Sequence, residues 1–174
     1  PARVHIQESV FAGVWRVVHT LGDGAVRDTL QVAAVPSVLR QVAREDGARE
    51  QRPSAALPPE LVNVPSLLIE LQDQRRSWRP GQSAHVVNLS LLPLTAQDIA
   101  YIDDRLGTGR VLMLSRGYGN CRITNCCVHH TWRVVYYNSQ DAVILNSIEV
   151  TDMPEVACAA REDLVDTLGR LQEV

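Results

Sequence analysis

One short pattern occurs twice in this chain at a nearly constant spacing. The sequence Trp-Arg-Val-Val occupies residues 15–18 and again residues 132–135, an offset of 117 (132 − 15). Farther along, residues 30–38 match residues 148–156 at an offset of 118 (148 − 30). Self-similarity of this kind is typical of a duplicated structural unit. It predicts a scaffold made of two copies of one supersecondary unit, with one residue gained in the second copy.

The second copy is expected to alternate strands with surface helices. Runs of β-branched residues that end at turn residues indicate strands, and apolar residues at helical spacing indicate helices. The predicted strands are 82–92, 111–115, 121–128, 132–137 and 143–150. One helix is expected to begin at Thr95, which forms a capping box with Asp98, and to end at Leu106. Another is expected from Pro154, with an apolar stripe at Val156, Ala160, Leu164, Leu168 and Leu171.

The first copy shows only the second part of this pattern. It predicts strands over 4–10, 14–20 and 25–33 and a helix after Pro36, and a separate helix is expected over 65–76. We therefore expect three segments: residues 1–44 as the back half of a first repeat, 45–60 as a charged, proline-rich linker, and 61–174 as a second, complete repeat. The front half of the first repeat would precede Pro1. The predicted fold class is α/β of the α+β type, a two-layer sandwich with a mostly antiparallel sheet, helices on one face and an internal duplication.

Alignment of the two copies identifies one face of one strand in each. The apolar positions on this face are Val26, Leu30 and Val32 in the first copy and Ile144, Ile148 and Val150 in the second. Because they recur at every second residue, they share one side of a strand. Asp28 and Asn146 fall on this same side. Either a buried hydrogen-bonded pair that fixes strand register or an exposed edge would account for these polar residues.

Composition and charge restrict the class of protein. A chain of 174 residues with 45% hydrophobic residues can bury a core, and its net charge of −3 offers no broad basic surface for nucleic acid. No apolar run approaches about 18 residues and no basic-then-apolar leader is present, so we expect a soluble protein without a membrane span. The four cysteines lack the spacing of secreted disulfide modules or zinc knuckles, which indicates reduced thiols in the cytosol.

The segment 121–130 is the most suggestive one for chemistry, because thiolates and imidazoles can bind zinc or iron. The candidate metal ligands are Cys121, Cys126, Cys127 and His130. On one continuous strand these side chains would alternate between two faces, which divides the ligand set. The first copy has apolar or small residues at the three cysteine positions, which favours buried packing. A metal site and an activated thiol stay open as alternatives, while the residues predict no catalytic group and no cofactor.

Four longer motifs carry a family resemblance. They are IQESVFAGVW at 6–15, LSRGYGNCRI at 114–123, YNSQD at 137–141 and EVTDMPEVACAA at 149–160. On these motifs the chain resembles, over essentially its whole length, the hydrogenase expression/formation proteins of the HupH/HyaF/HoxQ family, whose members are longer at the N-terminus. The resemblance implies an accessory chaperone, not an enzyme, for nickel–iron uptake hydrogenases. It would bind the small-subunit precursor in the bacterial cytoplasm, before iron–sulfur cluster completion and export.

Two turns are the candidate partner-binding segments, because binding residues concentrate on loops held by a rigid scaffold. The residues proposed for recognition are Arg116, Tyr118, Asn120, Arg122, Asn138, Gln140 and Asp141. Other maturation factors are further candidate partners, and exposed strand edges would allow a homodimer. The main alternative function is a thiol- or metal-handling protein that delivers or protects iron–sulfur components. A permanent structural subunit of a hydrogenase assembly is a third class.

Overall fold

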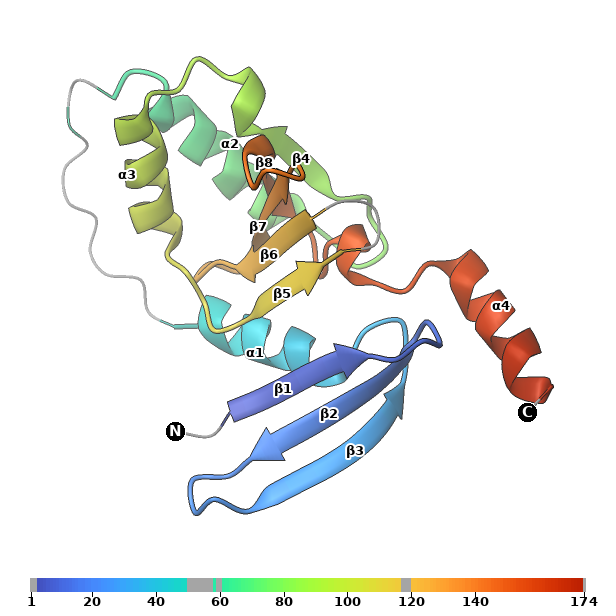
Figure 1. The fold of residues 1–174 in the computed structure, drawn as a ribbon. Helices are drawn as coiled ribbons and strands as arrows, with labels where there is room; N and C mark the ends of the chain where they lie inside the picture. Colours follow the sequence, from blue (N-terminus) through green and yellow to red (C-terminus); the bar gives the residue numbers. More distant parts are fainter. Residues whose placement is uncertain (1–2, 50–57, 59–60, 117–119, 174) are drawn as a thin grey trace. The chain divides into compact units, whose positions relative to one another are not determined.

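The computed structural model describes residues 3–49, 58, 61–116 and 120–173. The chain divides into two compact units, one made of Pro1–Leu39 with Glu155–Val174 and the other of Arg40–Pro154; Figure 1 shows their elements. The mixture of helices with antiparallel sheets confirms the predicted fold class. Within the described ranges, every helix is too short or too polar to cross a membrane.

The larger unit is built on a five-stranded sheet in which all neighbouring strands are antiparallel. Its strands lie in the order β4-β8-β7-β6-β5. Their bounds are His85–Asn88 for β4, Leu112–Ser115 for β5, Asn120–Asn125 for β6, Thr131–Tyr137 for β7 and Val143–Val150 for β8. The strands β5 to β8 follow one another in the chain, so this part of the sheet is a meander, in agreement with the mostly antiparallel sheet that the sequence predicts.

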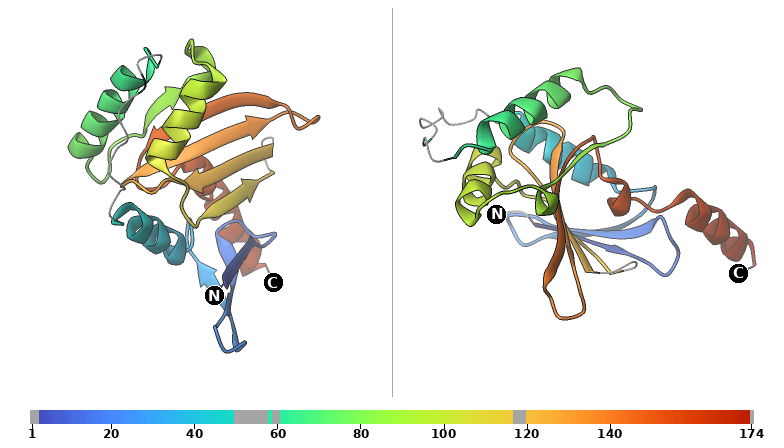
Figure 2. Two further views of the ribbon diagram at one scale, coloured as in Figure 1. Left: turned by 90° about the vertical axis from the view of Figure 1, so that its left-hand side faces the viewer. Right: turned by 90° about the horizontal axis from the view of Figure 1, so that it is seen from above.

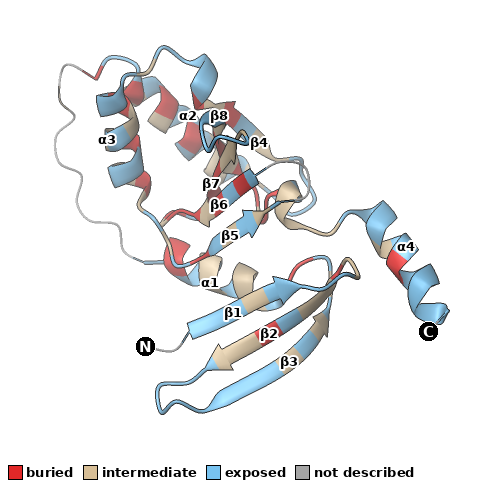
Figure 3. Ribbon diagram, viewed as in Figure 1, coloured by how far each residue is buried: buried red, intermediate tan, exposed pale blue. Residues whose placement is uncertain are grey.

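Helices α2 (Val64–Ser77) and α3 (Ala96–Leu106) lie on one face of this sheet (Figure 2). Helix α3 begins with the predicted capping box, in which Asp98 N donates to Thr95 Oγ1 at 3.1 Å and Thr95 N donates to the Asp98 carboxylate at 2.7 Å. Buried apolar side chains pack between the helices and the sheet, and this burial is the main stabilising contribution. Figure 3 shows in red the buried positions along α2 and α3. The core residues are Leu61, Val64, Leu67, Leu71, Val87, Leu89, Ile102, Leu106, Cys126, Val128, Ile148 and Val150.

Helix α1 (Ser37–Gly47) is the helix expected after Pro36. It begins in the smaller unit and continues into the larger one at Arg40. The last three residues, which the sequence assigned to the linker, are helical, and Asp46 among them is fully buried. Residues 50–57 and 59–60 of the expected linker lie outside the described residues. The two compact units are defined by contacts between residues, whereas repeats are defined by common origin. The division into repeats at residues 1–44, 45–60 and 61–174 therefore stays a prediction.

The smaller unit holds a three-stranded antiparallel sheet, in the order β1 (Arg3–Glu8), β2 (Val14–Thr20) and β3 (Val26–Val32). Helix α4 (Arg161–Gln172) belongs to the same unit. Gly13 in the β1–β2 turn has a φ of 76°, and a Cβ at this position would overlap with the side chain of Leu164 from α4. Only glycine satisfies both the left-handed conformation and the close approach.

The strand registers of the two sheets support the duplication. Trp15 on β2 lies opposite Glu8 and Gln31, and Trp132 on β7 lies opposite Asn125 and Glu149. These partners are separated by the same offsets of 117 (125 − 8) and 118 (149 − 31) that the sequence shows. The register shifts at Tyr136/Tyr137, near the end of β7, where the second copy accommodates its extra residue. Both tryptophans therefore occupy the same topological place, the middle strand of three consecutive antiparallel strands, β1 to β3 in one sheet and β6 to β8 in the other.

Three predicted elements differ from the structure. The strand expected over 82–92 is strand only over β4 and then becomes a 3-10 turn at Leu89–Leu91. The strand expected over 121–128 ends at Asn125: the Cys126 N–H still donates to Thr131 O and closes the turn to β7, but the Cys127 N–H donates away from the sheet, to Leu106 O. The helix expected from Pro154 is present as α4, but its predicted start is wrong. A 3-10 turn at Glu155–Ala157 comes first, the Ala159 N–H then donates to Ala34 O at 2.8 Å, and α4 begins at Arg161.

Candidate functional site

The cysteine and histidine candidates lie near the start of β6 and in the turn after this strand, so they do not share one strand. Cys121 is on β6, whereas Cys126, Cys127 and His130 lie in the segment that joins β6 to β7. Cys126 N donates to Thr131 O at 2.9 Å and closes this turn. His130 adopts a φ of 55°, in the left-handed region that few non-glycine residues occupy. The alternation between two strand faces expected from the sequence is therefore wrong for this segment.

The thiols of this segment are in packing environments. Cys126 belongs to the core between helices and sheet, and burial raises the pKa of its thiol to about 12. Cys121 is also buried, and burial raises the pKa of its thiol. A cysteine acts as nucleophile or metal ligand in its thiolate form, which burial disfavours. Among residues 3–49, 58, 61–116 and 120–173, the structure contains no group of three or more His, Cys, Asp or Glu side chains that could hold a metal ion.

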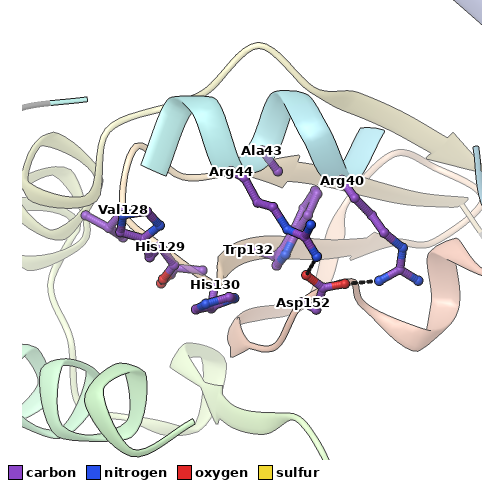
Figure 4. Close-up of a pocket in the computed structure, with 9 residues that line it drawn as sticks. Arg40, Ala43, Arg44, Val128, His129, His130, Trp132 and Asp152 are labelled. Atoms are coloured by element: carbon purple, nitrogen blue, oxygen red, sulfur yellow. Dashed lines mark hydrogen bonds and ion pairs between the residues drawn. The ribbon is translucent and has the colours of Figure 1, made fainter. Parts of the chain in front are cut away.

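His130 forms part of a small cavity beside α1, shown in Figure 4. Its ring stacks on the indole of Trp78, with 4.2 Å between ring centroids. Burial lowers the pKa of this imidazole, although the carboxylate of Asp152 opposes the shift. Asp152 is held by two arginines of α1: Arg40, and Arg44 at 3.1 Å. A neutral, stacked imidazole next to a carboxylate that arginines already neutralise is typical of a packing contact, and it joins α1 to the β6–β7 turn.

The described residues that flank the two turns proposed for recognition lie at one end of the five-stranded sheet. Asn120, at the start of β6, pairs with Tyr137, at the end of β7, so the β5–β6 and β7–β8 connections are at the same end of the sheet. The second turn is shaped by Asn138, whose Oδ1 accepts hydrogen bonds from two backbone N–H groups at 2.9 and 3.0 Å. The exposed candidates at this end are Arg116, Asn120, Gln140 and Asp141. Tyr118 lies outside the described residues.

A groove that the sequence did not predict opens beside α3 on the helix-covered face of the five-stranded sheet. Its volume is about 330 Å³. The apolar part of its wall is formed by Ile99 and Leu106 of α3 with Val135 and Val143 of the sheet. Arg122, which is exposed, also lines it and so connects the groove to the end of the sheet that carries the two turns. Grooves of this kind, apolar with a few polar groups, are typical binding sites.

Two polar side chains in the groove are incompletely paired. Arg133 exposes 13% of its side chain, and its Nη2 lies 3.2 Å from Asp103 of α3. Arg133 Nη1 and Asn146 Oδ1 are both buried, and neither has a hydrogen-bond partner in the described part of the chain. Burial lowers the pKa of the Arg133 guanidinium, while Asp103 opposes this shift, and an arginine nevertheless stays protonated. The groove therefore offers one donor and one acceptor that nothing described in this chain satisfies.

The first copy has equivalents of Arg133 and Asn146, and there the two side chains form an ion pair with each other. Arg16 corresponds to Arg133 and Asp28 to Asn146. Arg16 Nε lies 3.1 and 3.0 Å from the two Asp28 carboxylate oxygens, and Arg16 Nη2 lies 2.6 Å from one of them. The exchange of a carboxylate for an amide in the second copy leaves its arginine without this partner. The aligned repeats contained part of this signal, since Asp28 and Asn146 fall at equivalent positions, while their position next to arginine comes from the strand pairing.

Comparisons with known proteins agree with the family resemblance. The family described as HupH hydrogenase expression protein, C-terminal conserved region, matches residues 61–174. Hydrogenase expression/formation protein HoxQ of Cupriavidus necator is 54% identical over 99% of this chain and 61% of its own length. Hydrogenase-1 operon protein HyaF of Escherichia coli is 33% identical over 97% of this chain and 59% of its own length. The chain thus spans about three-fifths of the length of these relatives.

A solved structure is similar as well. It is a hydrogenase expression protein HupH from Thiobacillus denitrificans, with a TM-score of 0.59 and 27% sequence identity. The match covers 64% of this chain and 92% of that protein's chain.

Proposed function

Because the chain belongs to the HupH family of hydrogenase expression/formation proteins, we propose that it takes part in hydrogenase maturation as an accessory chaperone. In this proposal it binds the precursor of the small subunit of a nickel–iron uptake hydrogenase before the iron–sulfur clusters are complete and before export. Binding takes place in the cytoplasm, where such a precursor is made. The observation that carries the proposal is similarity over nearly the whole chain to proteins named for hydrogenase expression and formation.

The proposed activity is binding and release, without covalent chemistry on the partner. Two features of the larger unit support it. The exposed turn residues and the groove beside α3 offer surface that a polypeptide can contact. The thiol of Cys126, by contrast, offers no such surface, because Cys126 is buried in the core and the pKa of its thiol is raised to about 12. These properties suit packing better than delivery or protection of iron–sulfur components, which was the alternative.

Affinity capture from a host that makes the hydrogenase tests the proposal. The full-length protein, tagged and produced at its natural level, is expected to co-purify with the small subunit in its precursor form, identified by intact mass. Blocking iron–sulfur cluster assembly in the host should increase the captured amount, because the precursor then accumulates. Capture of no hydrogenase component, or of the mature enzyme in fixed stoichiometry, would reject the chaperone proposal; the second result would indicate a permanent subunit.

The same purification also distinguishes the chaperone from the alternative function, a thiol- or metal-handling protein. A metal or iron–sulfur handler should carry iron or zinc when purified without oxygen, and the metal should be lost when Cys126 and Cys127 are changed to serine. The chaperone proposal expects less than one equivalent of metal for the wild type and the same value for the Cys127→Ser variant, whose fold is less affected than that of a Cys126 variant. Stoichiometric metal that depends on Cys127 would support the alternative.

A further inference from the structure

The groove beside α3 contains a donor and an acceptor that form a matched pair. Arg133 lies opposite Ile148, and Val135 lies opposite Asn146, so Arg133 and Asn146 are diagonal neighbours on adjacent strands and on the same face. Arg133 Nη1 and Asn146 Oδ1 are buried and unpartnered among the described residues, and both residues line the groove. Buried polar groups in folded proteins are nearly always hydrogen-bonded. A ligand that reaches this position would therefore gain both hydrogen bonds without displacing a protein partner.

We propose that this groove binds an extended, uncharged segment of the partner polypeptide, with a peptide group of the partner between Arg133 and Asn146. The inference rests on the proposed function, since it names where the small-subunit precursor is held. A peptide group presents a carbonyl oxygen for Arg133 and an N–H for Asn146, so one group satisfies both. Apolar side chains of the same segment would occupy the wall formed by Ile99, Leu106, Val135 and Val143.

The charges around Arg133 favour a peptide group over a free anion at this position of the groove. Asp103 already lies 3.2 Å from the Arg133 guanidinium, so the positive charge of Arg133 is compensated within the protein. An acidic ligand would be repelled by this carboxylate and would leave Asn146 Oδ1 without a donor. A peptide group has no net charge and supplies a donor as well as an acceptor. The apolar wall, which an inorganic anion would not contact, adds to this preference.

The first copy shows how the site can be closed, and this provides a matched pair of variants. Asn146→Asp places a carboxylate diagonal to Arg133, as Asp28 is placed relative to Arg16. The internal ion pair would then take up the donor that the partner needs. Asp28→Asn is the control, because it makes the reverse exchange in the smaller unit, where Arg16 and Asp28 are exposed and line no part of the groove.

The test measures the affinity of the full-length protein for purified small-subunit precursor. Wild type and Asp28→Asn should bind equally, and Asn146→Asp should bind about tenfold more weakly, which corresponds to about 1.4 kcal/mol. The melting temperature of Asn146→Asp should be equal to or above that of the wild type, so that lost binding is not lost folding. Equal affinity of wild type and Asn146→Asp would overturn the groove assignment and leave the chaperone proposal standing. If the wild type itself does not bind, the chaperone proposal fails and the groove assignment fails with it.

A second pair decides the matter if Asn146→Asp does not fold. Val143 is 54% exposed at the rim of the groove, and Val86 is 53% exposed on β4 outside it. Both tolerate a long polar side chain, since both already face solvent. Val143→Arg should weaken precursor binding by about tenfold, whereas Val86→Arg should not change it. Equal binding by the two variants would contradict the proposal.

Discussion

Asp46 lies fully buried at the end of α1 and accepts two hydrogen bonds from Arg110, one from its backbone N–H and one from Nε, each at 2.7 Å. The amide of Asn125 donates to the same carboxylate at 3.1 Å. These contacts fasten α1 to the loop before β5 and to the end of β6. Asp46→Ala would leave three donors unpaired and should lower the free energy of unfolding by about 3 kcal/mol, measured by urea unfolding. A loss below about 0.5 kcal/mol, the range of an ordinary surface substitution, would contradict this account.

The same carboxylate should make stability depend on acid pH. Although burial raises the pKa of Asp46, the hydrogen bonds from Arg110 and Asn125 outweigh it, so the folded-state pKa is below the ordinary value. The charged neighbours are Arg110, Arg49 at 3.5 Å and Glu45 on the same helix. A lowered pKa stabilises the fold above the unfolded-state pKa, about 4, and this contribution is lost as the pH falls below it. Below pH of about 4, wild type should therefore lose stability more steeply than Asp46→Asn; parallel curves would refute the assignment.

Gly109 is required for the Asn125 contact. Its N–H donates to Asn125 O at 2.8 Å, and an added Cβ would overlap with the Asn125 side chain, which is 1% exposed and cannot move aside. Gly109→Ala should cost about 2 kcal/mol of stability. Gly169 in α4 is the control, because no atom lies within 4 Å of an added Cβ there. Gly169→Ala should stabilise slightly, by about 0.5 kcal/mol, since alanine favours a helix more than glycine. Similar melting temperatures for the two variants would be evidence against this packing.

The duplicated strands should respond differently to the same substitution. Ile148 and Leu30 hold equivalent positions, but Ile148 is 0% exposed beneath the helices and Leu30 is 73% exposed. Ile148→Ala should reduce the free energy of unfolding by about 3 kcal/mol because it opens a cavity. Leu30→Ala should change it by less than about 0.5 kcal/mol. Chemical denaturation of the two variants compares them directly, and equal costs would mean that the first sheet is covered on this face.

The thiols should differ in reactivity in the folded protein. Cys121 and Cys126 are buried, whereas Cys127 and Cys158 are partly exposed. Because burial raises the pKa of Cys126 to about 12, almost none of its thiolate is present near neutral pH. Alkylation followed by peptide mass analysis should label Cys127 and Cys158 first and Cys126 only after unfolding. Labelling of Cys126 as fast as Cys127 would revive a role for this thiol pair in chemistry.

The sequence predicted those parts of the fold that local residues or repetition determine. The capping box at Thr95 acts within one turn of helix, so it was visible without tertiary information. The strands β5 to β8 were predicted from β-branched runs between turn residues, and the partners of Trp15 and Trp132 keep the offsets of the two tryptophan segments. The end of β6 was not predictable in this way, because Cys126-Cys127-Val128 continues a strand-like apolar run. Cys127 N instead donates to Leu106 O, a contact that exists only once α3 is in place.

The candidate site shows the same division. Strand order alone brings the flanks of the two turns proposed for recognition to one end of the sheet, and their role in binding stays a prediction. The groove was missed because it depends on how far α3 covers the strands, which periodicity does not reveal. The change from Asp28 to Asn146 was seen in the aligned repeats, but its consequence needed the position of Arg133. The start of α4 was missed for a similar reason. The N–H of Ala159, just before this helix, donates to the carbonyl oxygen of Ala34, which is far away in the sequence.

The most direct measurement of the central claim is a calorimetric titration of the full-length protein with purified small subunit in two forms, the precursor without clusters and the mature cluster-containing subunit. The chaperone account predicts saturable binding of the precursor, at least about tenfold tighter than binding of the mature form. Equal affinity for both forms, or no heat of binding to the precursor, would contradict it.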